Sequence, residues 1–369
     1  MWNPLQTYKD KMPKETFARV RRHWLSLAFV FGFIVDNITL NSVEQLFDNL
    51  VLLTYLILSM GSILALYTAA AGKFPEEWNA FVRLYAPFVI QYAFGGLLSG
   101  MLIFYGRSGA WTESWPFLVI ILAVIAGNEL IKDRSSRFLF NTTIFFVGLF
   151  SYVVLIVPVV TGHMGAWIFL GSGFLALLVM YVFIRLLRLV IPNFLALQMK
   201  TLVFTIGTIY AVFNFLYFAN IIPPIPLSLK DVGIYHRVIR FETGQYQLQY
   251  EEGKWWQFFK DSDATFHPDE NGQIFCFASV FTPTRLNTDI YHSWEYYDEE
   301  AKKWVEHARL SYPILGGRNG GYRGYTLIES YRDGKWRCNV ETERGQVLGR
   351  ETFTVDSTQK PSELVTREE

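Results

Sequence analysis

The chain has 369 residues, of which 51% are hydrophobic and 17% aromatic, and its formal net charge is zero. This sum conceals an asymmetry, because residues 1–222 carry 15 Lys and Arg against 10 Asp and Glu, whereas residues 223–369 carry 18 against 23. Neither part contains a dense basic block, so the composition excludes an ordinary nucleic-acid-binding protein.

Long apolar runs predict about seven transmembrane helices in the first 222 residues. A bilayer core about 30 Å thick requires about 20 mostly apolar helical residues. The runs that meet this requirement are 24–40, 47–70, 83–105, 115–132, 137–160, 166–189 and 200–222. The basic tail before them, residues 1–23, lacks the pattern of a cleavable signal peptide, so we expect the first run to stay in the membrane.

Positive charges in the connections predict the orientation of these helices. The N-terminal tail and every second connection together carry 14 Lys and Arg residues, whereas the opposite connections carry only Arg107. Positively charged connections remain in the cytoplasm. We therefore expect a cytoplasmic N-terminus, a transmembrane domain over residues 24–222, and a domain outside the cytoplasm over residues 223–369.

Among the polar residues of the predicted spans, we single out five as candidates: Asp36, Gln91, Asn128, Glu129 and Asn214. An ionisable group inside a membrane is a functional hypothesis by default. Asp36 and Glu129 lie close to the ends of their spans, so we interpret the set mainly as groups that form hydrogen bonds between helices. The alternative is a transporter or channel. It requires a polar cavity between the helices that is lined by Gln91, Asn128, Glu129 and Asn214.

Beyond the proline-rich segment of residues 221–226, the hydrophobic period changes from helical to two. Alternating runs separated by turn residues are typical of strands. The runs are 236–242, 246–250, 273–282, 292–297, 304–312, 321–329, 335–341 and 347–355. They predict an antiparallel sandwich of about seven to nine strands. Asp333-Gly334 and Arg344-Gly345 have the composition of tight hairpin turns.

The two cysteines, Cys276 and Cys338, each lie on a predicted strand. Alternation places Cys338 on one face with Trp336 and Val340, which predicts that this thiol points into the core. Outside the cytoplasm a disulfide is chemically allowed. Two buried free thiols are the alternative, because the sequence does not determine the distance between them.

A glycine-rich segment, residues 316–325, contains four candidate ligand-binding residues: Arg318, Tyr322, Arg323 and Tyr325. Glycines let the backbone approach a ligand, and two guanidinium groups could bind a carboxylate, a phosphate or a sugar acid. The structural alternative, which we favour, is a bulge or turn between strands.

Four histidines of the C-terminal part could in principle surround a metal ion: His236, His267, His292 and His307. None has a second ligand histidine two or four positions away, so the spacing predicts no metal site. His292 and Trp294 lie on one face of a predicted strand. We interpret them as a packing and hydrogen-bonding pair, and retain both as candidate ligand-binding residues.

Several short segments between residues 281 and 355 form a recognisable pattern. They are Phe281-Thr-Pro-Thr284, His292-Ser-Trp294, Gly316–Tyr325, Gly334-Lys-Trp-Arg337, Val340–Arg350 and Phe353-Thr-Val355. Together they resemble the bacterial domain-of-unknown-function family 2914. The resemblance implies a bacterial inner-membrane protein with a multi-helix membrane region and an immunoglobulin-like outer domain. It implies no established activity, so no functional residue can be carried over.

These observations lead to one functional expectation and two alternatives. No catalytic constellation is evident, and no cofactor is expected. We expect a membrane-anchored binding or sensing module that sits in the lipid bilayer and whose outer sandwich contacts an envelope protein or glycan. The alternatives are a transporter or channel with an accessory domain, and an envelope enzyme acting at the outer leaflet with ionisable residues near residues 223–236.

Overall fold

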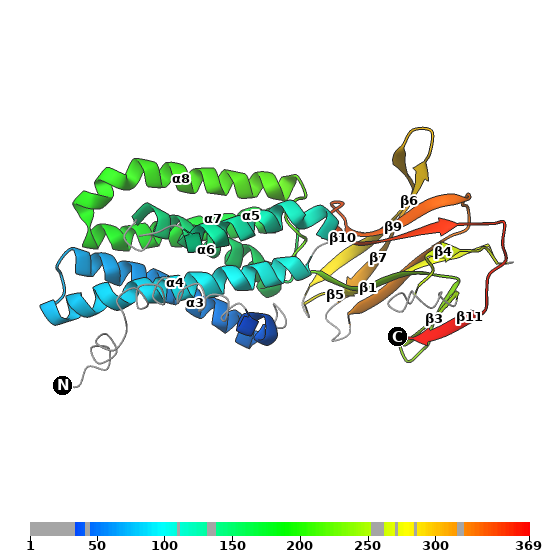
Figure 1. Cartoon of the computed structure of the whole chain (residues 1–369), viewed down its shortest axis with the longest axis horizontal. Helices are drawn as coiled ribbons and strands as arrows, with labels where there is room; N and C mark the ends of the chain where they lie inside the picture. Colours follow the sequence, from blue (N-terminus) through cyan, green and yellow to red (C-terminus); the bar gives the residue numbers. More distant parts are fainter. Residues whose placement is uncertain are drawn as a thin grey trace, which may run out of the picture. The chain divides into compact units, whose positions relative to one another are not determined.

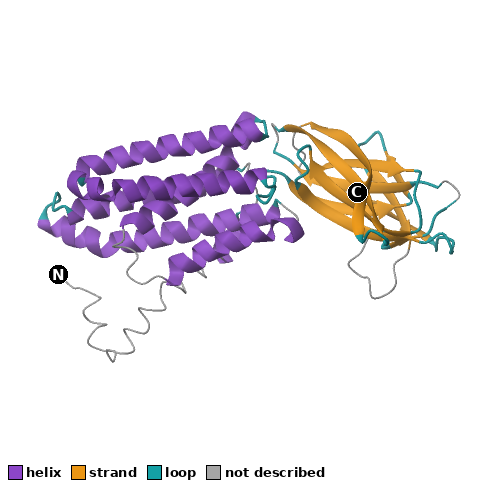
Figure 2. Ribbon diagram, turned by 90° about the horizontal axis from the view of Figure 1, so that it is seen from above, coloured by secondary structure: helices purple, strands orange, loops and turns teal. Residues whose placement is uncertain are grey.

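The computed structural model describes residues 34–40, 45–108, 111–130, 138–251, 262–269, 272–283, 286–315 and 321–369. The chain divides into two compact units. The first comprises Met1–Ile103, Leu118–Ile156 and Phe169–Phe215, and the second comprises Phe104–Phe117, Val157–Ile168 and Leu216–Glu369. Helices dominate the first unit, and all the described strands belong to the second (Figure 2).

The described helices overlap the predicted apolar runs, and Figure 1 shows how they are arranged. They are α3 Leu46–Ala70, α4 Glu76–Arg107, α5 Trp111–Leu130, α6 Phe138–Thr161, α7 Ala166–Val190 and α8 Pro192–Phe218, and residues 34–39 are also helical. Within the described residues, five helices are long and apolar enough to cross a membrane: α3, α4, α6, α7 and α8. The predicted span 24–40 lies largely outside the described residues, and α5 contains only a shorter apolar segment, Trp115–Val124.

Two helices begin well before the predicted spans. Helix α4 starts at Glu76 rather than residue 83, and α8 starts at Pro192 rather than residue 200. Acidic residues are favourable in the first turn, where the helix dipole is positive, and proline is tolerated at the first helical position. In α4 the apolar segment follows a polar first turn, which hydropathy misses, and in α8 the helix extends back past Lys200 to its proline.

The helix surfaces are strongly apolar. On α8, the side chains of Leu197, Phe204 and Phe215 are 81%, 76% and 68% exposed. Exposed apolar side chains on this scale are unusual in a water-soluble unit and are typical of a surface that contacts lipid. The exposure therefore agrees with the hydropathy of these helices.

The second unit contains three sheets made of eleven described strands. The strands are β1 Ser228–Tyr235, β2 Arg237–Arg240, β3 Tyr246–Glu251, β4 Thr265–Phe266, β5 Ile274–Phe281, β6 Asn287–Asp298, β7 Lys303–Leu315, β8 Tyr322–Ile328, β9 Gly334–Thr342, β10 Val347–Val355 and β11 Leu364–Glu368. Their orders are β1-β5-β8, β4-β10-β9-β6-β7 and β11-β3-β2. All neighbours are antiparallel except the parallel pair β4 and β10.

All eight predicted strands are present, but the prediction missed three others. These are β1, which follows the prolines, the two-residue β4, and β11 at the end of the chain. The turn at Arg344-Gly345 is confirmed, since β9 and β10 pair as a hairpin and Gly345 has a φ of 77°. The hairpin predicted at Asp333-Gly334 is wrong. Strands β8 and β9, which flank it, belong to different sheets, so the segment crosses between sheets instead.

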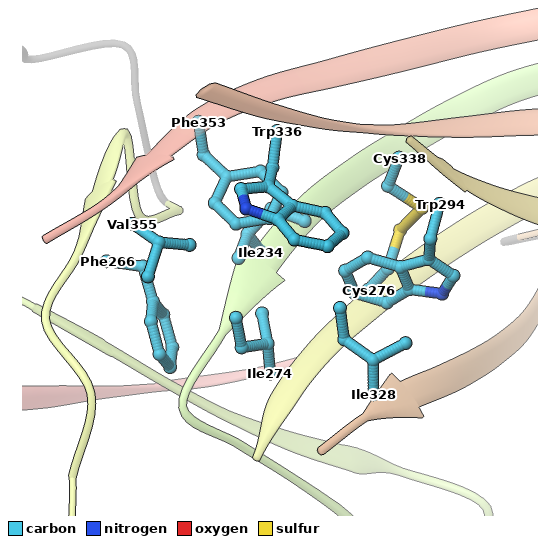
Figure 3. Packing of buried hydrophobic residues seen from close by; sticks show 10 residues of the cluster. All are labelled: Ile234, Phe266, Ile274, Cys276, Trp294, Ile328, Trp336, Cys338, Phe353 and Val355. Atoms are coloured by element: carbon cyan, nitrogen blue, oxygen red, sulfur yellow. A yellow bond between two sulfur atoms is a disulfide. The ribbon is translucent and has the colours of Figure 1, made fainter. Parts of the chain in front are cut away.

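The main core of the β unit lies between the three-stranded sheet β1-β5-β8 and the five-stranded sheet. Ile234 and Ile274 come from the first sheet, whereas Trp294 and Trp336 come from the second, and all four are buried. Figure 3 shows the disulfide between Cys276 and Cys338 among these side chains. Because aromatic rings bury a large apolar area, the two tryptophans contribute much of the cohesion between the sheets.

Candidate functional site

The glycine-rich segment is used structurally where it is described. Arg318 lies outside the described residues. Arg323 Nη2 pairs with Glu369 Oε2 at 3.2 Å. Gly324 allows a close approach, since an added Cβ would lie 2.3 Å from the ring of Tyr312. The ring of Tyr325 packs against that of Phe275. Tyr322 also packs against the apolar core. These contacts agree with the structural interpretation of the segment.

His292 and Trp294 lie inside the core and share one partner. The side chains of both residues contact Thr326 Oγ1, each at 3.0 Å, and His292 Nε2 lies 3.2 Å from Tyr312 Oη. Complete burial lowers the pKa of His292 to about 3, so this imidazole is neutral. The two residues therefore connect β6 to β8 across the core and are inaccessible to an outside ligand.

Cys276 on β5 and Cys338 on β9 form a disulfide, with their Cα atoms 6.6 Å apart. The sulfur atoms lie near His292, in a group that has the donor types of a metal site. A disulfide leaves no thiolate to bind a metal, so this group serves to link the two sheets. The sequence left the choice between disulfide and thiols open.

The polar residues of the membrane region do not gather into one described site. Asp36 accepts hydrogen bonds from Ser99 Oγ at 2.9 Å and from Tyr55 Oη at 3.3 Å, which links residues 34–39 to α3 and α4. Asn214 donates to the backbone oxygen of Tyr210, one turn earlier on α8. The side chain of Gln91 contributes to none of these bonds, and the side chains of Asn128 and Glu129 lie outside the described part.

A cavity of about 540 Å³ lies between α5, α6 and α8. Its lining is apolar apart from two threonines: Val124, Leu139, Phe140, Thr143, Ile144, Val147, Thr205 and Ile209. Gln91 and Asn214, the two described residues among the four that a polar transport cavity was expected to contain, do not belong to this lining. Its chemistry suits lipid chains or packing against another helix.

The outward face of the five-stranded sheet carries a connected row of polar side chains. Arg350 Nε donates to Asn339 Oδ1 at 2.6 Å, and Asn339 Nδ2 donates to Glu295 Oε1 at 2.9 Å. Arg337 Nε donates to the other oxygen of Glu295 at 2.6 Å. Successive residues on a strand point to opposite faces, so these side chains face away from the core that Trp294 occupies. The row crosses β10, β9 and β6.

Aromatic rings extend this row onto β7. The guanidinium carbon of Arg337 lies 4.3 Å from the ring centre of Trp304, and that ring lies 5.3 Å from the ring of Tyr297. Lys335 Nζ lies 5.9 Å from the Tyr297 ring. The aromatic–arginine row is defined here as Arg350, Asn339, Glu295, Arg337, Trp304 and Tyr297. It presents pre-arranged cationic and aromatic groups on one surface, with the buried side chain of Asn339 linking Arg350 to Glu295.

A second group, the carboxylate–histidine cluster, consists of His236, Glu251, Asp263 and His267. His236 lies between β1 and β2, Glu251 ends β3, and the other two residues flank β4. His236 Nε2 lies 3.2 Å from Glu251 Oε1 and 3.5 Å from Asp263 Oδ2. His267 Nδ1 lies 2.8 Å from Glu251 Oε2. The hairpin of β2 and β3 brings the first pair together.

Burial sets the charge of this cluster. It lowers the pKa of His236, so the imidazole is neutral near pH 7. Burial also raises the pKa of Asp263 to about 8. It would raise the pKa of Glu251 too, but hydrogen bonds from Ser362 and His267 outweigh it and hold that pKa below its usual range. The cluster thus contains an ionised carboxylate and a second carboxyl group that burial holds largely protonated.

Sequence reasoning named His236 and His267 but missed the two carboxylates. The predicted strands of residues 236–242 and 246–250 form a hairpin, and this hairpin was the signal that could have identified Glu251. Its register pairs Arg237 with Gln249, so the residue before the first strand lies beside the end of the second. Asp263 lies 12 residues beyond Glu251 and reaches it through a backbone hydrogen bond from Glu251 N to its Oδ1 at 2.7 Å. No local spacing predicts that contact.

These features define a protein with several long apolar helices and a C-terminal domain of antiparallel sheets. Residues 287–355 match the family model described as Protein of unknown function (DUF2914), which confirms the resemblance drawn from the motifs. No curated protein matches the chain in sequence. One solved structure aligns with 86% of this chain and all of its own: Pseudomonas fluorescens alkylpurine DNA glycosylase AlkC bound to DNA containing an abasic site analog, with 9% identity and a TM-score of 0.21. That TM-score does not indicate a shared fold.

Proposed function

We propose that this chain is a bacterial inner-membrane protein whose C-terminal immunoglobulin-like sandwich lies outside the cytoplasm and binds another envelope protein. Its helices would anchor the domain and provide a route for a signal. In this proposal the predicted spans 24–40 and 115–132 complete seven crossings with the five long apolar helices. An odd number of crossings and the 14 positive charges on one side against one on the other support the orientation.

The disulfide supports the same placement of the β domain. Disulfides persist in oxidising compartments and are rare in the cytoplasm. Cys276 and Cys338 are both fully buried, and their bond joins two sheets of the domain core. A bond at this position suits a domain that folds outside the cytoplasm.

The observation that carries the binding function is the aromatic–arginine row. Trp, Tyr and Arg are enriched at the centres of protein interfaces, where they contribute most of the binding free energy. In the row, Trp304 and Tyr297 lie side by side, and Arg337 is held in place by Glu295. A pre-arranged surface loses less side-chain entropy when a partner binds. The whole row also lies within the region that matches the family model.

Site-specific photo-cross-linking in living cells tests this function. A photoreactive amino acid would replace Glu306, which is exposed on β7 and lies beside Ser293 of β6. The matched control is the exposed Glu363, which lies outside the five-stranded sheet. We expect one recurrent protein adduct at position 306 and none at position 363, with the partner identified by mass spectrometry.

A second variant connects the adduct to the row. Trp304→Ala should reduce the adduct at position 306 about fivefold or more, since loss of a central interface residue costs more than about 1 kcal/mol of binding free energy. Equal adducts at both positions, or an adduct unaffected by Trp304→Ala, would contradict the proposal. An adduct with glycan alone would contradict a protein partner and would indicate that the row binds a saccharide.

A further inference from the structure

We propose that His236, Glu251 and Asp263 bind a divalent transition-metal ion, for which Zn²⁺ is the probe. One ligand atom from each of these three residues lies within 4.8 Å of the other two. They come from different elements of the β unit, and all three residues are buried. The three lie outside the region that matches the family model, residues 287–355. The proposal is independent of the partner-binding row.

The distances suit such an ion. Zinc binds imidazole nitrogen and carboxylate oxygen at about 2.0–2.2 Å, so neighbouring ligand atoms of a tetrahedral site lie about 3.4 Å apart. His236 Nε2 lies 3.2 Å from Glu251 Oε1 and 3.5 Å from Asp263 Oδ2. The second distance is long for a hydrogen bond. Small movements of these side chains would therefore admit an ion between them.

Two atoms of the cluster have no hydrogen-bond partner among the described residues. Asp263 Oδ2 and His236 Nδ1 form no hydrogen bond with any described residue. The Asp263 side chain has no exposed surface, and that of His236 is 1% exposed. A buried polar atom without a partner costs about 1–3 kcal/mol, and more when it is charged. A cation bound to Asp263 Oδ2 would remove this cost at that atom.

The surrounding residues hold the ligands in place. Ser362 donates from its backbone nitrogen and its hydroxyl to Glu251 Oε2, at 3.1 and 3.2 Å. His267 donates from its backbone nitrogen to Glu251 Oε1 at 3.0 Å. The ring of His236 stacks on that of Phe266, with centres 4.2 Å apart. Such outer contacts orient metal ligands and raise metal affinity.

The donor set selects the class of metal. One imidazole nitrogen and two carboxylate oxygens suit zinc, manganese or iron, whereas calcium and magnesium prefer oxygen donors alone and more of them. A tetrahedral ion would have one remaining position for water or for His267.

Metal analysis of the purified full-length protein in detergent tests this proposal. After equilibrium dialysis against Zn²⁺, we expect one ion per chain in the wild type. Asp263→Asn and His236→Gln should each raise the dissociation constant at least about 100-fold, because changes to outer contacts alone cost 10–100-fold. The matched controls, Asp289→Asn and His163→Gln, change exposed residues outside the cluster and should bind as the wild type does.

Asp263→Asn also separates metal binding from folding. An asparagine can still accept the hydrogen bond from Glu251 N, so the variant should fold. Zn²⁺ should raise the thermal unfolding temperature of the wild type and leave that of Asp263→Asn unchanged. Absence of bound Zn²⁺ in the wild type, or equal binding in all four variants, would overturn the site. Tighter binding of Mg²⁺ or Ca²⁺ than of Zn²⁺ would overturn the class of metal.

Discussion

His236 and His292 are both buried histidines, and their neighbours give them different roles. His292 is surrounded by hydroxyl groups, Thr326 at 3.0 Å and Tyr312 at 3.2 Å, so it needs no charge to satisfy its ring nitrogens. His236 instead faces the carboxylate of Glu251 and leaves Nδ1 without a described partner. The first is a structural bridge, whereas the second has the surroundings of a metal ligand.

The neutral state of His292 predicts a pH dependence of stability. Its pKa is about 3 in the folded protein and 6.5 in a model peptide, so below pH 6.5 the unfolded state binds the extra proton. The free energy of unfolding should therefore fall as the pH decreases from 6.5 towards 3, by at most about 1.4 kcal/mol per pH unit from this group. His292→Gln should be less stable at pH 7 but lose less stability on acidification, as measured by thermal unfolding followed by tryptophan fluorescence.

His163→Gln provides the control for that experiment. His163 is exposed, so its replacement should keep the acid dependence of the wild type. If His292→Gln shows the same slope as the wild type between pH 7 and 4, His292 does not contribute to acid sensitivity.

Strands β5 and β9 lie in different sheets, and the disulfide is the covalent link between them. Cys276 pairs in register with Thr326 on β8, while Cys338 pairs with Trp294 on β6. The disulfide and the hydrogen bond from Trp294 Nε1 to Thr326 Oγ1 therefore cross the core at adjacent positions. This arrangement fixes how the two sheets face each other.

Removing the disulfide should strongly destabilise the β domain. The bond closes a loop of 62 residues, and constraint of the unfolded chain by a loop of this size contributes about 4 kcal/mol. Cys276→Ala with Cys338→Ala should lower the free energy of unfolding by about 2–5 kcal/mol, measured by denaturant unfolding of the full-length protein. Reductant should destabilise the wild type and have no effect on the double variant; equal stability of the two proteins would show that the bond contributes nothing.

The proposed topology concerns the five long apolar helices and the β domain together. The loop charges favour a cytoplasmic N-terminus, and the disulfide independently favours a β domain outside the cytoplasm. This orientation decides which compartment supplies the binding partner and the metal ion to the β domain. Topology is therefore the property that connects the proposals.

Reporter fusions measure that topology. Reporters active in the periplasm should work after Ser228 and at the C-terminus, whereas a reporter active in the cytoplasm should work after Lys73, between α3 and α4. A cytoplasmic C-terminus would mean that the predicted seven spans include one too many, with the span that contains Asp36 as the first candidate. Cys276 and Cys338 should then be thiols in the cell.

Local periodicity predicted much of this protein. Apolar runs of about 20 residues located the long helices, and alternation located eight of the eleven described strands. Alternation also placed Cys338 on a core face, and glycine marked the turn at Gly345. These features depend on the backbone period and on short-range turn geometry, which a few neighbouring residues determine.

Tertiary structure decided which distant segments meet. The crossing at Gly334, the disulfide, the aromatic–arginine row and the carboxylate–histidine cluster each join strands or connections that lie far apart in sequence. Asp263 illustrates the reason: it has no distinctive local pattern, and only the packing of the whole domain brings it to the hairpin that pairs His236 with Glu251. Sheet order and register depend on packing of the whole domain, so they can be read only from the folded chain.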